Sequence, residues 1–71
     1  MLDAKALRVA MLMKSCTAIE LSKAMGISKT ALYRRLRGVV SFTVQEAEAC
    51  RQRLELTSED VVRIFFAEEV A

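Results

Sequence analysis

Apolar residues along this chain recur at intervals of three and four, and polar residues fill the positions between them. This spacing is typical of helices with one buried face, and no stretch alternates between apolar and polar residues as a half-buried strand does. In the segment 44–54, for example, one helical face carries Val44, Ala47, Cys50 and Leu54. The pattern therefore predicts an all-α protein.

Four helix starts are marked by capping residues. A Ser or Thr side chain satisfies a free N–H group at a helix start, and an acid three residues later returns a second hydrogen bond. An apolar residue before each cap is matched by another five positions later, as in a hydrophobic staple. The four starts are Thr17 (acid Glu20; staple Cys16 with Leu21), Ser28 (no acid; Ile27 with Leu32), Thr43 (Glu46; Phe42 with Ala47) and Thr57 (Asp60; Leu56 with Val61).

These starts divide the chain into five helices of a single domain, residues 1–71. Gly26 and Gly38 tolerate a left-handed backbone and end the second and third helices. The connections are two to five residues long, which predicts a compact five-helix bundle without a linker. The expected helices run from Asp3 to about Met13, and over 18–25, 29–37, 44–54 and 58–66.

The second and third helices, with a three-residue turn between them, have the layout of a helix-turn-helix motif over residues 17–37. Leu21 faces inward on the first helix of the pair, and Ser22 is small where the two helices approach each other. Leu32 and Leu36 are four residues apart and bury the inner face of the second helix of the pair. This arrangement leaves the outer face of residues 29–37 for another function.

Over about residues 17–66, the chain resembles the lambda-repressor-like helix-turn-helix family (phage repressor and Cro, XRE type). The resemblance rests on the Gly-Ile-Ser start of the third helix, on the run Leu-Tyr-Arg-Arg-Leu-Arg-Gly, and on the later Phe-Thr-x-x-Glu-Ala and Leu-Thr-x-Glu-Asp segments, which are similar to small prophage regulators. The family usually has Ala where this chain has Ser22. The resemblance implies a lambda-repressor-like fold and double-stranded DNA as the partner.

The third helix is the predicted recognition helix. At 3.6 residues per turn, the face opposite its buried leucines carries Thr30, Arg34 and Arg37. The planar fork of Arg34 matches O6 and N7 of guanine in the major groove. The predicted base-reading residues are Lys29, Thr30 and Arg34, where Lys29 and Thr30 correspond to base-contacting positions in the family that the chain resembles.

Phosphate contacts are expected around this surface. Arg37 lies near the C-terminal end of the helix. Tyr33 lies on its flank, where it either donates its hydroxyl to phosphate or packs against the preceding helix. The N–H groups of Thr17 and Ala18 start the preceding helix and are expected to be free to bind another phosphate. The predicted phosphate-contacting residues are Thr17, Ala18, Ser28, Tyr33 and Arg37.

Charge is unevenly divided along the chain. The net charge is +2, but residues 1–38 carry +6 and residues 39–71 carry −4. The basic half therefore suits a polyanionic partner. Arg35 is the exception among the basic residues of the third helix, because it points back toward the edge of the core. We expect its stem to lie on apolar surface and its charge to pair with an acid of the second half.

Surplus apolar side chains lie in the first and last helices. Adjacent Phe65 and Phe66 leave their helix about 100° apart. They either fill a small core or form a self-association patch, and we favour the patch because exposed apolar areas usually mark an interface. The predicted dimer interface consists of Phe65, Phe66 and Val70. A twofold dimer would place two recognition helices about 34 Å apart, one turn of DNA.

Composition excludes several kinds of site. The 71 residues include no His and two Gly, and two cysteines cannot fill a four-ligand zinc site, so no metal, cofactor or enzymatic activity is expected. The longest apolar stretch, 9–13, is far shorter than the roughly 20 residues of a membrane span. The N-terminus has no signal-peptide pattern, which indicates a cytoplasmic protein in which Cys16 and Cys50 are reduced and buried.

Two functions are compatible with these features. The first is a sequence-specific DNA-binding regulator of transcription, of the prophage or mobile-element repressor type, that acts as a dimer on an operator. The alternative is a protein-interaction module, antitoxin-like or anti-repressor-like, that keeps the helix-turn-helix fold and binds another protein through its apolar patch. An enzyme is disfavoured because Glu46 and Glu48 lie on a helix without a pocket or a histidine.

Overall fold

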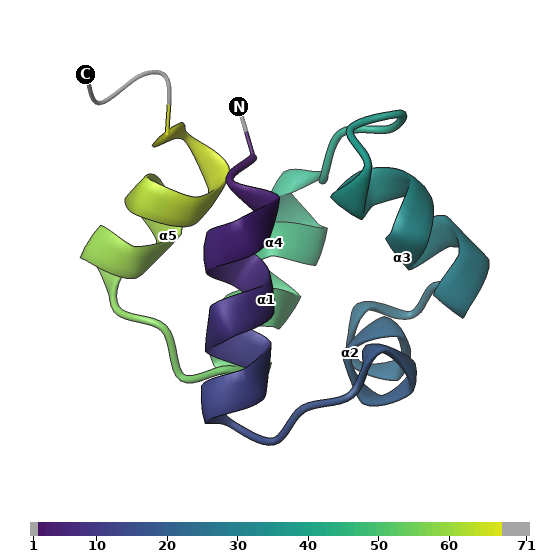
Figure 1. The fold of residues 1–71 in the computed structure, drawn as a ribbon, viewed down its shortest axis with the longest axis horizontal. Helices are drawn as coiled ribbons and strands as arrows, with labels where there is room; N and C mark the ends of the chain where they lie inside the picture. The colour runs from purple at the N-terminus through teal and green to yellow at the C-terminus, as the bar shows by residue number, and fades with distance from the viewer. Residues whose placement is uncertain (1, 68–71) are drawn as a thin grey trace.

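The computed structural model describes residues 2–67, and over that range it contains five α-helices and no strand (Figure 1). The prediction of an all-α bundle is confirmed, and each helix boundary lies within two residues of the one expected from the sequence. The helices are α1 (Ala4–Met13), α2 (Ala18–Met25), α3 (Lys29–Leu36), α4 (Val44–Arg53) and α5 (Ser58–Phe65).

Each helix begins at a residue whose side chain accepts a backbone N–H from three positions later. The four Ser and Thr caps predicted from the sequence are confirmed, and so are the three acids that return a hydrogen bond to the backbone of the cap. These bonds satisfy N–H groups that have no partner inside the helix. The caps are Asp3, Ser28 and, in reciprocal capping boxes, Thr17, Thr43 and Thr57.

Four helices end in the same kind of turn, although glycine marks only two of them. Gly26 and Gly38 have φ angles of 73° and 80°. After α1 and α4, the left-handed position is taken instead by Ser15 (φ 51°) and Glu55 (φ 52°). In each turn, the N–H of the following residue donates to a carbonyl five residues earlier, at 2.8 to 3.0 Å. This pattern is a Schellman motif, which satisfies carbonyl groups at the helix end.

The core takes side chains from every helix. Phe42, in the connection between α3 and α4, packs edge-on against Phe65, with 5.2 Å between the ring centroids. The start of the chain is tied to α5, since the N–H of Asp3 donates to the carbonyl of Ile64 at 2.6 Å. The largest fully buried side chains are Leu7, Leu21, Leu32, Cys50, Leu54 and Ile64.

Phe65 belongs to this core, with 7% of its surface exposed. The prediction that Phe65 lies in the dimer interface is therefore wrong, because its ring packs against Phe42 in the core. Phe66 is 41% exposed and remains a candidate for that interface. Val70, the third residue of the predicted interface, lies outside the described residues.

The helices are arranged so that α3 lies at one side of the molecule. Figure 1 shows α2 and α3 on one side and α5 on the opposite side, with α1 and α4 between them. The main packing of α3 is against α2, which also packs against α4, while α5 packs against α1 and α4. Within residues 2–67 every helix has eight or ten residues, so none is long enough to cross a lipid bilayer.

Candidate nucleic-acid interface

The outer face of α3 carries the three predicted base-reading residues. Lys29, Thr30 and Arg34 are all exposed. Within the described residues, neither Lys29 nor Arg34 forms an ion pair. The arrangement follows from the inner face of the same helix, where Leu32 and Leu36 are buried in the core. The face therefore presents two cations and a hydroxyl to the surroundings of the molecule.

Tyr33 and Arg37 flank this face. Arg37 is the C-cap of α3 and is exposed. Tyr33 exposes 41% of its surface, and its hydroxyl has no hydrogen-bond partner among residues 2–67. A tyrosine in this position has its polar end available to an external acceptor. Both residues are exposed and remain predicted phosphate contacts.

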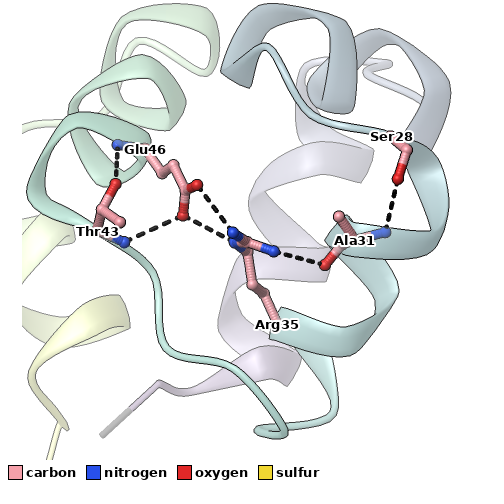
Figure 2. Close-up of polar contacts among 5 residues, drawn as sticks. All are labelled: Ser28, Ala31, Arg35, Thr43 and Glu46. Carbon is pink, nitrogen blue, oxygen red and sulfur yellow. Dashed lines mark hydrogen bonds and ion pairs between the residues drawn. The ribbon is translucent and has the colours of Figure 1, made fainter.

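Arg35 is held in a different environment from the other basic residues of α3. Its side chain is 14% exposed, and its Nε and Nη2 atoms donate to Oε1 and Oε2 of Glu46 at 2.7 and 3.0 Å. Its Nη1 atom donates to the carbonyl of Ala31, one turn earlier, at 3.0 Å (Figure 2). The prediction that Arg35 pairs with an acid of the second half is confirmed. Its charge is neutralised within the molecule.

The two partners keep each other ionised. Hydrogen bonds from Arg35, and to a smaller extent from the backbone of Thr43, lower the pKa of Glu46 against the opposing effect of desolvation. The hydrogen bond to Glu46 raises the pKa of Arg35 in return. Because hydrogen bonding to a charged group favours its charged form, the pair remains ionic at neutral pH.

The start of α2 differs from the sequence-based expectation. Oε1 of Glu20 accepts the N–H of Thr17 at 2.9 Å, and this backbone hydrogen bond is the main reason that the pKa of Glu20 is lowered. The prediction of a free N–H at Thr17 is therefore wrong, because the capping box that starts the helix uses it. The N–H of Ala18 has no partner among residues 2–67 and remains a predicted phosphate donor.

Ser28, at the start of α3, keeps a hydrogen-bond donor. Its Oγ accepts the N–H of Ala31 at 3.0 Å (Figure 2), which uses a lone pair of the hydroxyl and leaves its O–H free to donate. The residue is exposed. The cap and the predicted phosphate contact are therefore compatible.

Acidic side chains do not screen the outer face of α3. In the part of the chain that the structure describes, Glu46 is the one acid that forms an ion pair with a residue of this helix. Four other acids pair with bases outside α3: Glu48 with Arg51, Asp60 with Arg63, Glu55 with Lys14, and Glu20 with Arg53. Over residues 2–67, the acidic half of the sequence thus neutralises Arg35 but forms no ion pair with Lys29 or Arg34.

Apolar side chains are exposed in several other places, and two of these places hold the most exposed ones. An open hollow of about 530 Å³ lies beside the C-terminal end of α3, and its lining includes Arg37, Val40, Val44 and Phe66. Val44 is 85% exposed at its rim, so the prediction that it shares the buried face of Cys50 and Leu54 is wrong: it is the first residue of α4 and lies outside the core. On α1, Leu12 and Met13 are 80% and 79% exposed. These are the surfaces on which a protein partner could be accommodated.

The cysteines lie apart from these surfaces. Cys16 and Cys50 are buried and form no disulfide, as expected. Burial raises the pKa of the Cys50 thiol to about 12 and also raises that of Cys16, so both thiols are neutral at physiological pH. A neutral buried thiol is a poor nucleophile. Within residues 2–67, no three side chains of the kinds that bind metal ions come together.

Comparison of the chain with protein-family models, curated proteins and solved structures finds no match. The geometry and charge of α3 and its surroundings are therefore the features that indicate a function.

Proposed function

We propose that this protein is a sequence-specific DNA-binding regulator of transcription, a cytoplasmic repressor of the lambda-repressor-like, prophage or mobile-element type that acts as a homodimer on an operator. The observation that carries the proposal is the outer face of α3, where Lys29 and Arg34 are exposed and have no acidic partner among residues 2–67. That combination on the second helix of a helix-turn-helix layout is suited to the major groove.

Each exposed residue of α3 has a chemical role in this proposal. Arg34 forms two hydrogen bonds with O6 and N7 of a guanine, while Lys29 and Thr30 reach base edges from the N-terminal end of the helix. The surrounding groups fix the register on the duplex without reading its sequence. They are the Arg37 guanidinium, the hydroxyls of Tyr33 and Ser28, and the N–H of Ala18.

The cations also supply attraction that does not depend on sequence. Each Lys or Arg that neutralises a phosphate releases a counterion, so affinity for any duplex falls steeply as salt concentration rises. Discrimination between sequences then comes from the base-reading residues, where a good bidentate pair contributes roughly 1–3 kcal/mol.

A second candidate function is a protein-interaction module, antitoxin-like or anti-repressor-like. Its support is the exposure of Leu12, Met13 and Val44, which is unusual for apolar side chains in a small protein with so few residues to bury. In this alternative, α3 keeps its fold but binds no DNA.

The proposal is tested by selection from a library of random DNA duplexes with the intact protein. We expect enrichment of a twofold symmetric sequence with half-sites about one helical turn apart, since a symmetric dimer presents two copies of α3. The control is the double variant Lys29→Ala/Arg34→Ala, which changes only exposed side chains and should enrich no sequence. Failure of the folded wild-type protein to enrich any sequence would contradict the proposal.

A salt titration separates the two candidates. A regulator binds random duplex DNA at low salt and loses that binding steeply as salt is added. An interaction module shows almost no binding at any salt concentration. Fluorescence anisotropy with a labelled random duplex is sufficient for this measurement.

A further inference from the structure

We propose that Arg35 is a positioning residue, which acts through Glu46 to fix the orientation of α3 and so the direction in which the base-reading side chains point. The proposal rests on the proposed function, because it assigns a role in DNA recognition to a residue that does not face the DNA. Arg35 is next to Arg34 in the sequence, but its fork is used entirely within the protein.

The contacts of Arg35 connect two helices at a defined angle. One side of the guanidinium donates to both carboxylate oxygens of Glu46 in α4. The remaining nitrogen, Nη1, donates to the carbonyl of Ala31 in α3 (Figure 2). A two-point contact between planar groups fixes their relative orientation as well as their distance. The Arg35–Glu46 pair therefore constrains how α3 can rotate and tilt against α4.

The acceptor in this pair cannot move freely. Oε1 of Glu46 also accepts the N–H of Thr43 at 3.0 Å, while the N–H of Glu46 donates to Oγ1 of Thr43 at 3.0 Å. Figure 2 shows this capping box directly beside the Arg35 guanidinium. Movement of the carboxylate would break the hydrogen bond that it accepts from the N–H of Thr43 in this capping box at the start of α4. The helix itself is held by its packing against α2 and α5.

The rest of the packing of α3 is less directional. The helix has eight residues and packs mainly against α2. Leu32 and Leu36 anchor it to the core, but apolar burial depends on area and not on angle. The connection that follows contains the exposed residues Val39 and Val40. Of these attachments, the Arg35–Glu46 pair is the one whose geometry specifies an angle.

The energetics separate orientation from stability. For a nearly buried ion pair, the cost of removing both charges from water offsets much of their attraction, so the pair adds little net stability. Its side chains are 14% and 12% exposed. Replacing both partners together should therefore change stability little, whereas removing one partner leaves the other charge buried and unpaired and lowers the stability of the whole chain. The orientation of α3 is therefore read from a local signal in residues 29–36 and not from stability.

Three variants test the proposal. Arg35→Met keeps an apolar stem and removes the fork. Glu46→Gln removes the charge but keeps the cap, because Gln also serves at this position of a capping box. Arg35→Lys keeps the charge but cannot form the two-point contact. The matched control is Arg51→Met, which removes the same charge from an exposed two-point pair with Glu48 inside α4.

The first measurement needs no DNA. Amide relaxation-dispersion NMR of each variant should detect exchange in residues 29–36, with α1, α2 and α5 unchanged, whereas Arg51→Met should behave as the wild type. A purely structural role would lower the stability of the whole chain without exchange confined to residues 29–36. If Arg35→Met does not fold, Glu46→Gln and Arg35→Lys decide the result.

The second measurement uses the duplex that the wild-type protein selects. We expect each variant at Arg35 or Glu46 to lose about tenfold or more in affinity for that duplex. For a random duplex, each of these variants should lose no more affinity than Arg51→Met does. Unchanged α3 amides together with wild-type affinity would overturn the proposal. If the wild-type protein selects no duplex, the proposed function fails, and the amide measurement alone decides whether the pair orients α3.

Discussion

The four basic residues of the segment 29–37 differ in environment more than in chemistry; they are Lys29, Arg34, Arg35 and Arg37. Arg34 and Arg35 are adjacent, yet a helix turns by about 100° per residue and sends one to the surroundings and the other to the edge of the core. Arg35 is neutralised by Glu46, whereas Arg34 has no acidic partner within residues 2–67. A count of positive charges would treat these residues as equivalent, and the contacts show that they are not.

Arg34 and Arg37 should respond differently to replacement by Ala. Arg34→Ala removes the proposed bidentate base contact, which is worth roughly 1–3 kcal/mol, so affinity for the selected duplex should fall by about tenfold to a hundredfold, with a much smaller loss on random duplex. Arg37→Ala should weaken binding to both duplexes by the same factor and reduce the salt slope by about one. Anisotropy titrations at several salt concentrations measure both effects.

Both side chains are exposed, so circular dichroism should show that each variant keeps its fold. An Arg34→Ala variant that loses the same factor on both duplexes would move Arg34 to the phosphate contacts. Arg8→Ala on α1, also exposed, controls for the loss of one positive charge.

At the scale of the helices, starts were predictable and ends were only partly so. A helix start depends on hydrogen bonds between residues three apart, which are visible in the sequence. The ends at Ser15 and Glu55 lack the expected glycine, because a tertiary cause overrides the local preference. The residues that follow them, Cys16 and Leu56, are buried in the core, and their burial compensates for the left-handed backbone.

Replacement of Ser15 by Gly should stabilise the protein. A left-handed backbone costs a residue with a side chain about 1–2 kcal/mol, and the greater freedom of Gly in the unfolded chain cancels part of that gain. We expect the free energy of unfolding to rise by about 0.5–1 kcal/mol, measured by urea denaturation. Gly26→Ala, with φ at 73° and no neighbouring atom within 4 Å, should lower it by a similar amount through backbone strain alone.

Ser58→Gly is the control, because Ser58 lies in the first turn of α5 and gains nothing from a left-handed residue. A decrease in stability for Ser15→Gly would mean that the entropy of the unfolded chain outweighs the strain at this turn.

The candidate site was predictable where it depends on helical periodicity and not where it depends on tertiary partners. The exposure of Lys29, Thr30 and Arg34 follows from the two leucines on the opposite face of α3. The identity of Glu46 as the partner of Arg35 requires the position of α4, which the pattern of α3 does not contain. Likewise, Phe65 was misassigned because Phe42, its partner in the core, lies in a connection between helices.

At the scale of the whole molecule, the acidic half of the sequence has a structural use. Glu46 and Asp60 belong to capping boxes, and Glu48 pairs with a neighbour on its own helix. These carboxylates are used in helix caps and in ion pairs. Within residues 2–67, none of them forms an ion pair with Lys29 or Arg34.

The position of the hollow beside α3 indicates how two copies would associate in the proposed dimer. The hollow that contains Phe66 and Val44 reaches the C-terminal end of α3 at Arg37. A second copy that covers it leaves the N-terminal half of α3, with Lys29 and Thr30, free for the major groove. The other exposed apolar area, at Leu12 and Met13, lies at the end of α1.

We expect the protein to dimerise through the hollow. Phe66→Gln should then weaken dimerisation by about tenfold or more. The reason is that a twofold interface contains this ring twice, so the substitution removes its buried apolar area from both copies. Leu12→Gln, a matched change on α1, should leave the dimer intact. Sedimentation equilibrium of both variants measures the difference, and the opposite result would place the interface on α1. A wild-type chain that stays monomeric at every concentration would bind DNA through one α3 alone, and selection would then return a single asymmetric half-site instead of a palindrome.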